Sequence, residues 1–275
     1  MAHAIQDPLH THHHYTEKGE HLISSEAKIS DIGSWLKRGW LDMAHAPLAS
    51  LFYGLLMTLF VMTVYLFFKE TPILMFTVAT SFVMIAPFLA TGLYFIANQL
   101  EKGESPNLIK SLYAWRHNAT EFALFAVTLG VIIAIWSRIT PLIAGIVKSQ
   151  SLLIVNPDLG LMGFLSSDAG LQFLVAFMVI GAIVAAFAFA ISVVTIPLLL
   201  KDDKIGFISS MVISWKVVME NKLVMAVWAF TIAALVTVGL LTLGVAMVVV
   251  MPLLGFASWH AFTDLVEIDE SYQES

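Results

Sequence analysis

The residues best suited to metal chemistry lie near the start of the chain, in the stretch HTHHHY. This stretch contains His10, His12, His13 and His14, and His3 and His21 lie on either side of it. Imidazole nitrogens are common ligands of zinc, nickel and copper. No carboxylate or thiolate stands at ligand spacing, however, and a His-rich segment also binds such metals weakly without a biological role. The composition therefore favours a solvated tail over a metal site.

A second group of polar side chains closes the last apolar run, in VVVMPLLGFASWHAF at 248–262. Trp259 and His260 follow Pro252 at the end of a predicted helix. His260 can titrate or bind a metal, but a single His at a helix end is more often hydrogen-bonded to a neighbour. Trp259 is typical of an anchor at the membrane surface. We expect Asp264, at the membrane boundary, to pair with a nearby cation.

Many kinds of chemistry are excluded by residues that the chain lacks. It contains no cysteine, which excludes disulfides, thiolate metal sites and cysteine nucleophiles. The predicted membrane spans have no Asp, Glu, Lys or Arg in their middle, whereas proton relays and ion pathways are normally built from such groups. No phosphate-binding loop, zinc-protease helix or nucleophile elbow is present. We therefore expect no catalytic residues, no bound cofactor and no enzymatic activity.

The composition is that of a polytopic membrane protein. Apolar residues make up 59% of the 275 residues and charged residues only 12%. Runs long enough to cross the membrane as helices, which takes about 20 residues, lie at 48–68, 73–97, 120–137, 171–200 and 223–262. The last run is long enough for two spans, and Gly239 and Gly244 mark where a turn can lie. The pattern predicts an all-α fold with six transmembrane helices.

The polar segments divide the chain into three parts. Residues 1–28 are expected to be a disordered His-rich tail, 29–266 the membrane domain, and 267–275 an acidic tail. The segment at about 138–170 is expected to be a large outer loop, partly ordered and partly re-entrant or interfacial. Many of the acids behind the net charge of −6 lie in the tails. The charge therefore indicates solvated ends, and a nucleic-acid partner is not expected.

Positive residues lie unequally on the two sides of the membrane. One side receives Lys18, Lys28, Lys37, Arg38, Lys102, Lys110, Arg116, Lys201, Lys204, Lys216 and Lys222, and the other only Lys69, Arg138 and Lys148. Cytoplasmic loops carry the excess of Lys and Arg. Both termini are therefore expected in the cytoplasm.

An internal threefold repeat is visible in the chain. Amphipathic segments that contain Trp35, Trp115 and Trp215 each precede a pair of apolar runs, and the second run of each pair contains VMIAPFLA, VVTIPLLL or VVVMPLLG. The prolines in these motifs are Pro87, Pro197 and Pro252. Proline removes a helical hydrogen bond and kinks a helix. We expect three proline-kinked hairpins, each preceded by a cytoplasmic amphipathic helix, with static kinks favoured over moving hinges.

The fourth predicted span has a face of small residues. Ala182, Ala186 and Ala190 recur every four residues beside Gly181 and Ala185. Small residues let another helix approach closely. This helix is therefore expected to be central in the bundle.

Three segments together resemble a bacterial family of predicted integral membrane proteins catalogued as domain of unknown function 2189. They are WLKRGWLDMAHAPLASLFYGL from Trp35, PFLATGLY from Pro87 with LEKGESP after it, and PLLGFASWHAFTDLV from Pro252. The resemblance covers roughly residues 30–267. It implies a bacterial inner-membrane protein of about six helices and no particular reaction. Family members often have a His where Phe256 stands, so this chain lacks the second imidazole of a site shared with His260. It also departs from the family at Phe95, where members tend to carry an acid.

Two functions from different classes remain open at this stage. The first is a non-enzymatic scaffold or assembly partner for other membrane components, in contact with the lipid bilayer and with a membrane-protein partner. The alternative is a facilitator for a neutral or lipidic small molecule, which requires a cavity lined by Ser, Thr and Met at mid-membrane depth. Metal handling through the His-rich tail is a third option, and deletion of residues 1–28 would abolish it. The oligomeric state is not predicted.

Overall fold

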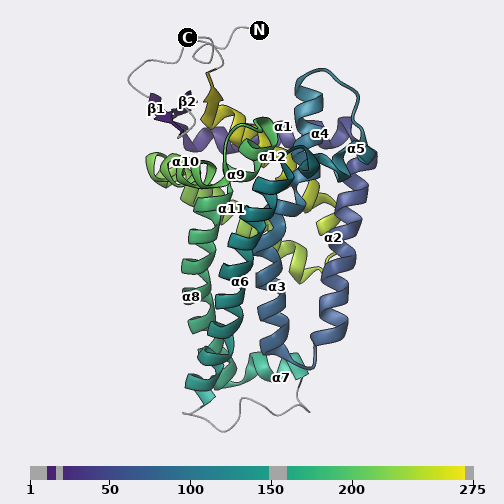
Figure 1. Ribbon diagram of the computed structural model, residues 1–275. Coiled ribbons are helices and arrows are strands. Elements are labelled where there is room, and N and C mark those ends of the chain that lie inside the picture. Colours follow the sequence, from purple (N-terminus) through teal and green to yellow (C-terminus); the bar gives the residue numbers. More distant parts are fainter. Residues whose placement is uncertain (1–10, 17–20, 149–159, 270–275) are drawn as a thin grey trace.

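The computed structural model describes residues 11–16, 21–148 and 160–269. These form a helical bundle with a small β-sheet at one end (Figure 1). The helices are α1 (Ile29–His45), α2 (Pro47–Phe68), α3 (Pro72–Leu89), α4 (Thr91–Glu101), α5 (Leu108–Leu112), the 3₁₀ helix η2 (Ala114–Asn118), α6 (Ala119–Lys148), α7 (Gly160–Ser166), α8 (Asp168–Ser192), α9 (Thr195–Lys201), α10 (Phe207–Glu220), α11 (Lys222–Leu241) and α12 (Met247–Leu265). The strands are β1 (Thr11–Tyr15), β2 (His21–Ser25) and β3 (Val266–Ile268).

Six helical segments of the described chain are long and apolar enough to cross a membrane, which confirms the predicted number. They are Pro47–Phe68, Pro72–Glu101, Ala114–Val147, Asp168–Lys201, Lys222–Leu241 and Met247–Leu265. The turn predicted between the last two lies between α11 and α12, and Gly244 has a φ of 91° there. A positive φ suits glycine, which has no Cβ to clash with its own backbone.

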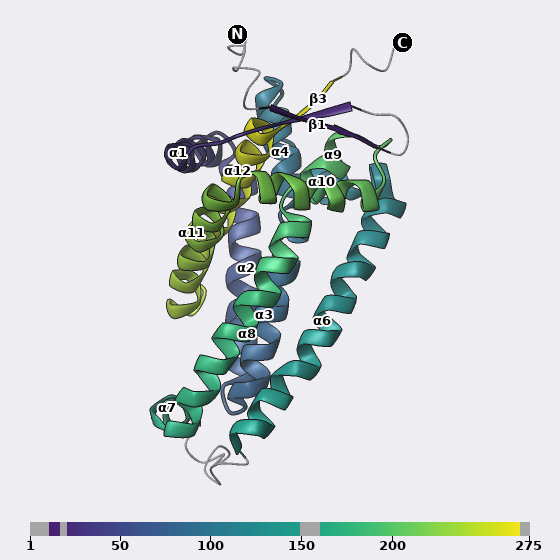
Figure 2. The ribbon, with the colours of Figure 1, turned by 90° about the vertical axis from the view of Figure 1, so that its left-hand side faces the viewer.

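The long helices run side by side, and the short ones close the two ends. Helices α2, α3, α6 and α8 extend along the bundle, while α1 and α10 lie across it beneath the sheet (Figure 2). We call this the sheet end and the opposite end, where α7 lies, the far end. Helices α11 and α12 are also in the bundle, but α11 stops partway along α8 (Figure 2).

The central helix of the bundle is α12, so the expectation that the fourth span is central is wrong. In the apolar stretch of α12, 67% of the residues are buried, against 17–28% in the other five candidate spans. The small face of α8 is divided, since Ala182 and Ala186 are exposed to the outside whereas Ala190 is buried. Small residues allow another helix to approach closely, but they do not determine which helix is buried in the centre of the bundle.

Two glycines on neighbouring helices let α12 be enclosed. A Cβ on Gly39 of α1 would lie 2.7 Å from the backbone nitrogen of Ala257. A Cβ on Gly54 of α2 would collide with the backbone of Val248, one turn before Pro252. Both helices therefore pack directly against the α12 backbone, which longer side chains would prevent.

The sheet contradicts the predicted disordered tail wherever residues 1–28 are described. Strand β2 pairs antiparallel with β1 on one side and with β3 on the other, in the order β1-β2-β3. Leu22 of β2 is fully buried and packs in the main core, and the backbone N–H of Ala27 donates to the side chain of Asn221. Residues 21–27 are held in place by partners some 200 residues or more later in the sequence, and local composition does not reveal such partners.

The predicted outer loop is also shorter than expected. Helix α6 continues past Pro141 to Lys148, and α8 begins at Asp168. Ile143 and Val147 are buried in a second core at the far end, together with Phe164 of α7. These apolar contacts stabilise a helix where the prolines and polar residues of the sequence favoured a loop.

The three repeat prolines have three different settings. Pro87 lies near the end of α3, and α4 begins at Thr91. Pro197 is the third residue of α9, so the interruption between α8 and α9 precedes it. Pro252 lies inside α12, which continues through it. In the first turn of α9 an N–H would have no helical partner, which is why proline is tolerated there.

Candidate functional site

The polar residues predicted at the end of the last span come together with residues of α1 and α4 at the sheet end. The cluster surrounds a small cavity of about 200 Å³ between these helices. Its lining consists of Arg38, Asp42, Leu100, Glu101, His260, Thr263 and Asp264. We call this group the α1–α12 cluster.

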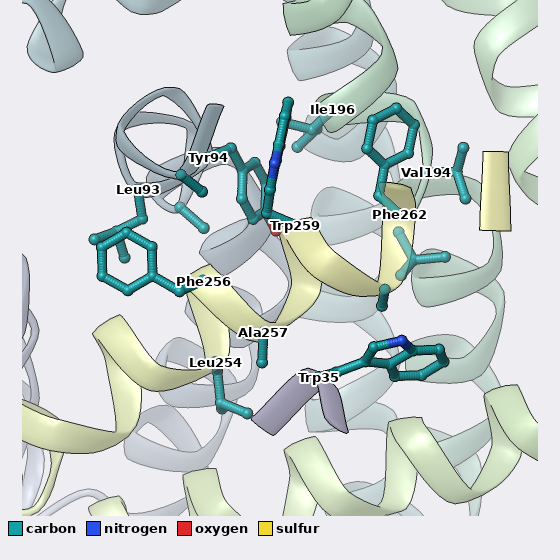
Figure 3. Packing of buried hydrophobic residues seen from close by; sticks show 14 of the residues in the cluster. Trp35, Leu93, Tyr94, Val194, Ile196, Leu254, Phe256, Ala257, Trp259 and Phe262 are labelled. Atoms are coloured by element: carbon teal, nitrogen blue, oxygen red, sulfur yellow. The ribbon is translucent and has the colours of Figure 1, made fainter. Parts of the chain in front are cut away.

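Trp259 was expected at the membrane surface, but it lies in the protein core. Its side chain is fully buried beside Tyr94 and Phe262, with ring centroids 6.4 Å and 5.5 Å away (Figure 3). The indole Nε1 donates a hydrogen bond of 3.0 Å to Glu101 of α4. Trp259 therefore fixes α12 against α4 from inside the core, and Phe256 is fully buried in the same core.

Asp264 finds the cation that was expected beside it. Its carboxylate accepts from Arg38 of α1 through both oxygens. It also accepts a hydrogen bond of 2.8 Å from the indole Nε1 of Trp35. A carboxylate held by a guanidinium fork and an indole N–H is a strong, directional link between two helices.

His260 pairs with an acid on α1. Its Nε2 lies 2.7 Å from Oδ2 of Asp42, and both side chains are largely buried, with exposures of 13% and 17%. The neutral imidazole donates to the carboxylate when the proton is on Nε2, and the protonated ring makes an ion pair. His260 thus has a hydrogen-bonded neighbour, as the sequence suggested for a single His at a helix end.

Each charged side chain of the α1–α12 cluster has a hydrogen-bond partner from a neighbouring helix or from the cluster itself. Asp264 accepts hydrogen bonds from Arg38 and Trp35. Asp42 pairs with His260, and Glu101 accepts a hydrogen bond from Trp259. The arrangement can therefore hold three helices in register. Its chemistry is that of a structural polar network.

Arg38, Asp42 and Glu101 were not recognised as site residues, although a signal exists in the sequence. Arg38 and Asp42 are four residues apart, as are His260 and Asp264. Residues at this spacing share a helix face. Two such pairs with complementary charges predict antiparallel contact, with Arg38 on Asp264 and Asp42 on His260.

The predicted His candidates lie apart from this cluster. His10 is outside the described residues, and His12 is exposed near Glu26. His13 Nδ1 lies 2.8 Å from His21 Nε2, whose ring in turn bonds Asp269. Across the described ranges, no group of three or more His, Asp or Glu side chains is placed to hold a metal ion.

His14 instead joins the sheet to α10. Its side chain is 6% exposed, and its Nε2 lies 2.8 Å from Ser24 and 3.4 Å from Glu220. Burial lowers the pKa of the His14 imidazole from its ordinary 6.5, Glu220 opposes this shift, and Lys216 and His12 add to it. The docked sheet therefore favours the neutral ring.

The fold and the cluster together define a polytopic helical membrane protein. Residues 74–201 match the model of a family described as "Predicted integral membrane protein (DUF2189)", which confirms the family resemblance over this segment. The match covers most of α3 through α9 and leaves out α1 and the motif around Trp259. No curated protein and no solved structure matches the chain.

Proposed function

We propose that this membrane protein is a non-enzymatic scaffold that binds another membrane protein through the outward face of α8. The observation that carries the proposal is the exposure of this face. Ala182, Ala185 and Ala186 are exposed, whereas Gly181 packs inward, where a Cβ would lie 3.1 Å from the ring of Trp136. In lipid, helices associate where small residues let their backbones approach. This face suits a helix of a partner.

The setting of this function is the bacterial cytoplasmic membrane, with both termini in the cytoplasm. The excess of Lys and Arg on one side supports this orientation. The pairing of β2 with both β1 and β3 supports it as well, because segments from the two ends of the chain meet at the sheet end. The bacterial origin rests on the family resemblance.

The test compares two matched variants of the full chain. Ala182→Leu with Ala186→Leu fills the α8 face, and Ala226→Leu with Ala234→Leu makes the same change at exposed alanines of α11. Each protein is cross-linked in its native membrane, purified and examined by mass spectrometry. We expect a stoichiometric complex with wild type and the α11 variant, and its loss with the α8 variant.

The opposite outcomes are equally clear. A protein that is purified alone, or a complex that survives the α8 changes, contradicts the scaffold proposal. One enriched lipid or small molecule in place of a protein would support the alternative of a facilitator.

A further inference from the structure

The turn between α11 and α12 lies beside the middle of α2. The hydroxyl of Thr58 donates a hydrogen bond of 2.7 Å to the carbonyl of Gly244. A Cβ on Gly244 would lie 3.0 Å from Cβ of Val61. Thr58 and Val61 are central in α2, which runs from Pro47 to Phe68. The hairpin therefore reaches only half the depth of a helix that crosses the whole membrane.

Both helices are long enough to cross a membrane, but the hairpin that they form ends beside the middle of α2. Helix α11 is inclined and ends partway along α8 (Figure 2). The C-terminal half of α12 lies at the sheet end, where Ala257 contacts α1 and Trp259 contacts α4. Much of α12 is consequently a core helix, consistent with its high burial.

The turn has the surface of a segment in lipid. Leu241, Leu243 and Val245 are 79%, 47% and 60% exposed. No Asp, Glu, Lys or Arg occurs between Lys222 and Asp264. The α2–α3 turn at the far end, in contrast, exposes Lys69 and Glu70. A turn in water favours polar residues, so the apolar α11–α12 turn fits the hydrocarbon interior.

The turn also satisfies its backbone N–H groups without water. Each backbone N–H from Thr242 to Val250 has an acceptor within the hairpin, including the Thr242 hydroxyl for Ala246. The carbonyl of Gly244 receives the Thr58 hydroxyl in addition. Non-helical backbone inside a bilayer is tolerated where it is buried in protein, and Gly244 of this turn is buried against α2.

We propose that α11 and α12 form a re-entrant hairpin confined to the leaflet at the sheet end, which makes the protein a one-sided wedge that prefers a curved lipid surface. Helices α1 and α10 lie flat at the same end, with Trp40 54% and Trp215 42% exposed. Amphipathic interfacial helices bind membranes in a curvature-sensitive way. The near leaflet thus accommodates more protein than the far leaflet. This inference needs no partner protein and is independent of the scaffold role.

The first experiment measures the depth of the turn. Because the chain has no cysteine, single spin labels can be placed at Leu243→Cys, at Glu70→Cys in the far-end turn and at Lys222→Cys at the sheet end. In lipid vesicles we expect the label at residue 243 to collide with oxygen and to be protected from a water-soluble nickel complex. The labels at 70 and 222 should show the reverse. Ready access of the nickel complex to residue 243 would overturn the re-entrant hairpin.

The second experiment measures curvature preference. The full chain is reconstituted into vesicles of several diameters, and molecules with the sheet end outward are counted on single vesicles with a fluorophore at Glu104→Cys. We expect their density to rise as the diameter falls, and molecules in the opposite orientation to show the reverse trend. Equal density at all diameters would overturn the wedge, whatever the depth of the hairpin.

Discussion

Two buried tryptophans that contact each other differ in one hydrogen bond. Trp35 and Trp228 pack edge to face with centroids 5.7 Å apart, and both are fully buried. Trp35 donates to Asp264, whereas Nε1 of Trp228 has no acceptor within the described part of the chain. An unsatisfied buried donor costs about 1–3 kcal/mol. The two indoles therefore make unequal contributions to stability.

Replacement of each ring by phenylalanine separates these contributions. Trp35→Phe removes a hydrogen bond to a carboxylate and is expected to lower the free energy of unfolding by about 2 kcal/mol. Trp228→Phe loses packing area but also removes an unsatisfied N–H, so we expect a change within about 1 kcal/mol. Reversible unfolding in mixed detergent micelles measures both. Equal losses for the two variants would contradict this account of the hydrogen bonds.

At the scale of elements, the contact of α2 with α12 depends on the absence of a side chain at Gly54. Gly54→Ala places a methyl group against the Val248 backbone. Such overpacking costs about 1–3 kcal/mol. Gly130 of α6 is the matched control, because nothing lies within 4 Å of a Cβ there. We expect Gly130→Ala to be neutral or stabilising by up to about 1 kcal/mol, and thermal unfolding of the purified variants distinguishes the two.

The attachment of the sheet to α10 should depend on pH. The pKa of His14 is lower in the docked sheet than its ordinary 6.5, so the docked state binds fewer protons than the undocked one. Docking is then fully favourable above about pH 6.5 and weakens as the pH falls below it. Above this range no pH dependence is expected from His14.

Spin labels at Thr11→Cys and Lys222→Cys measure this change as a distance. We expect one narrow distance at pH 8 and a broader distribution near pH 5, which is still above the ordinary pKa of a carboxyl group, about 4. His14→Gln cannot take up a proton, so its distribution should change less. The exposed His117→Gln is the control and should behave as wild type. A response identical in all three proteins would exclude His14 as its cause.

The spans could be predicted from local sequence, and the contacts between them could not. A run such as 48–68 is recognisable because lipid selects apolar residues at every exposed position. The burial of Trp259 was missed, because a Trp at a helix end is equally typical of the membrane surface. The strands were missed because β2 is stabilised by β3, some 240 residues later in the chain. The i, i+4 pairs of α1 and α12 show that part of the α1–α12 cluster can be predicted from the sequence.

At the scale of the whole molecule, the distribution of Lys and Arg among the loops predicts an orientation in the membrane. Glu104 is exposed in the loop between α4 and α5 at the sheet end, and Glu70 lies in the α2–α3 turn at the other. In intact cells, we expect a membrane-impermeant maleimide to label Glu70→Cys and not Glu104→Cys. Permeabilised cells should label both. The reverse pattern in intact cells would place the sheet outside the cytoplasm.

The order β1-β2-β3 also has a consequence for biosynthesis. The ribosome makes β1 and β2 before the helices and β3 after them, so β2 gains its second neighbour only once α12 has been translated. Domains generally fold as units during synthesis, from the N-terminus onward. Here the sheet can close only after all six candidate spans have been synthesised. A nascent chain that has not yet reached Val266 keeps one edge of β2 open, and an open strand edge can pair with another chain.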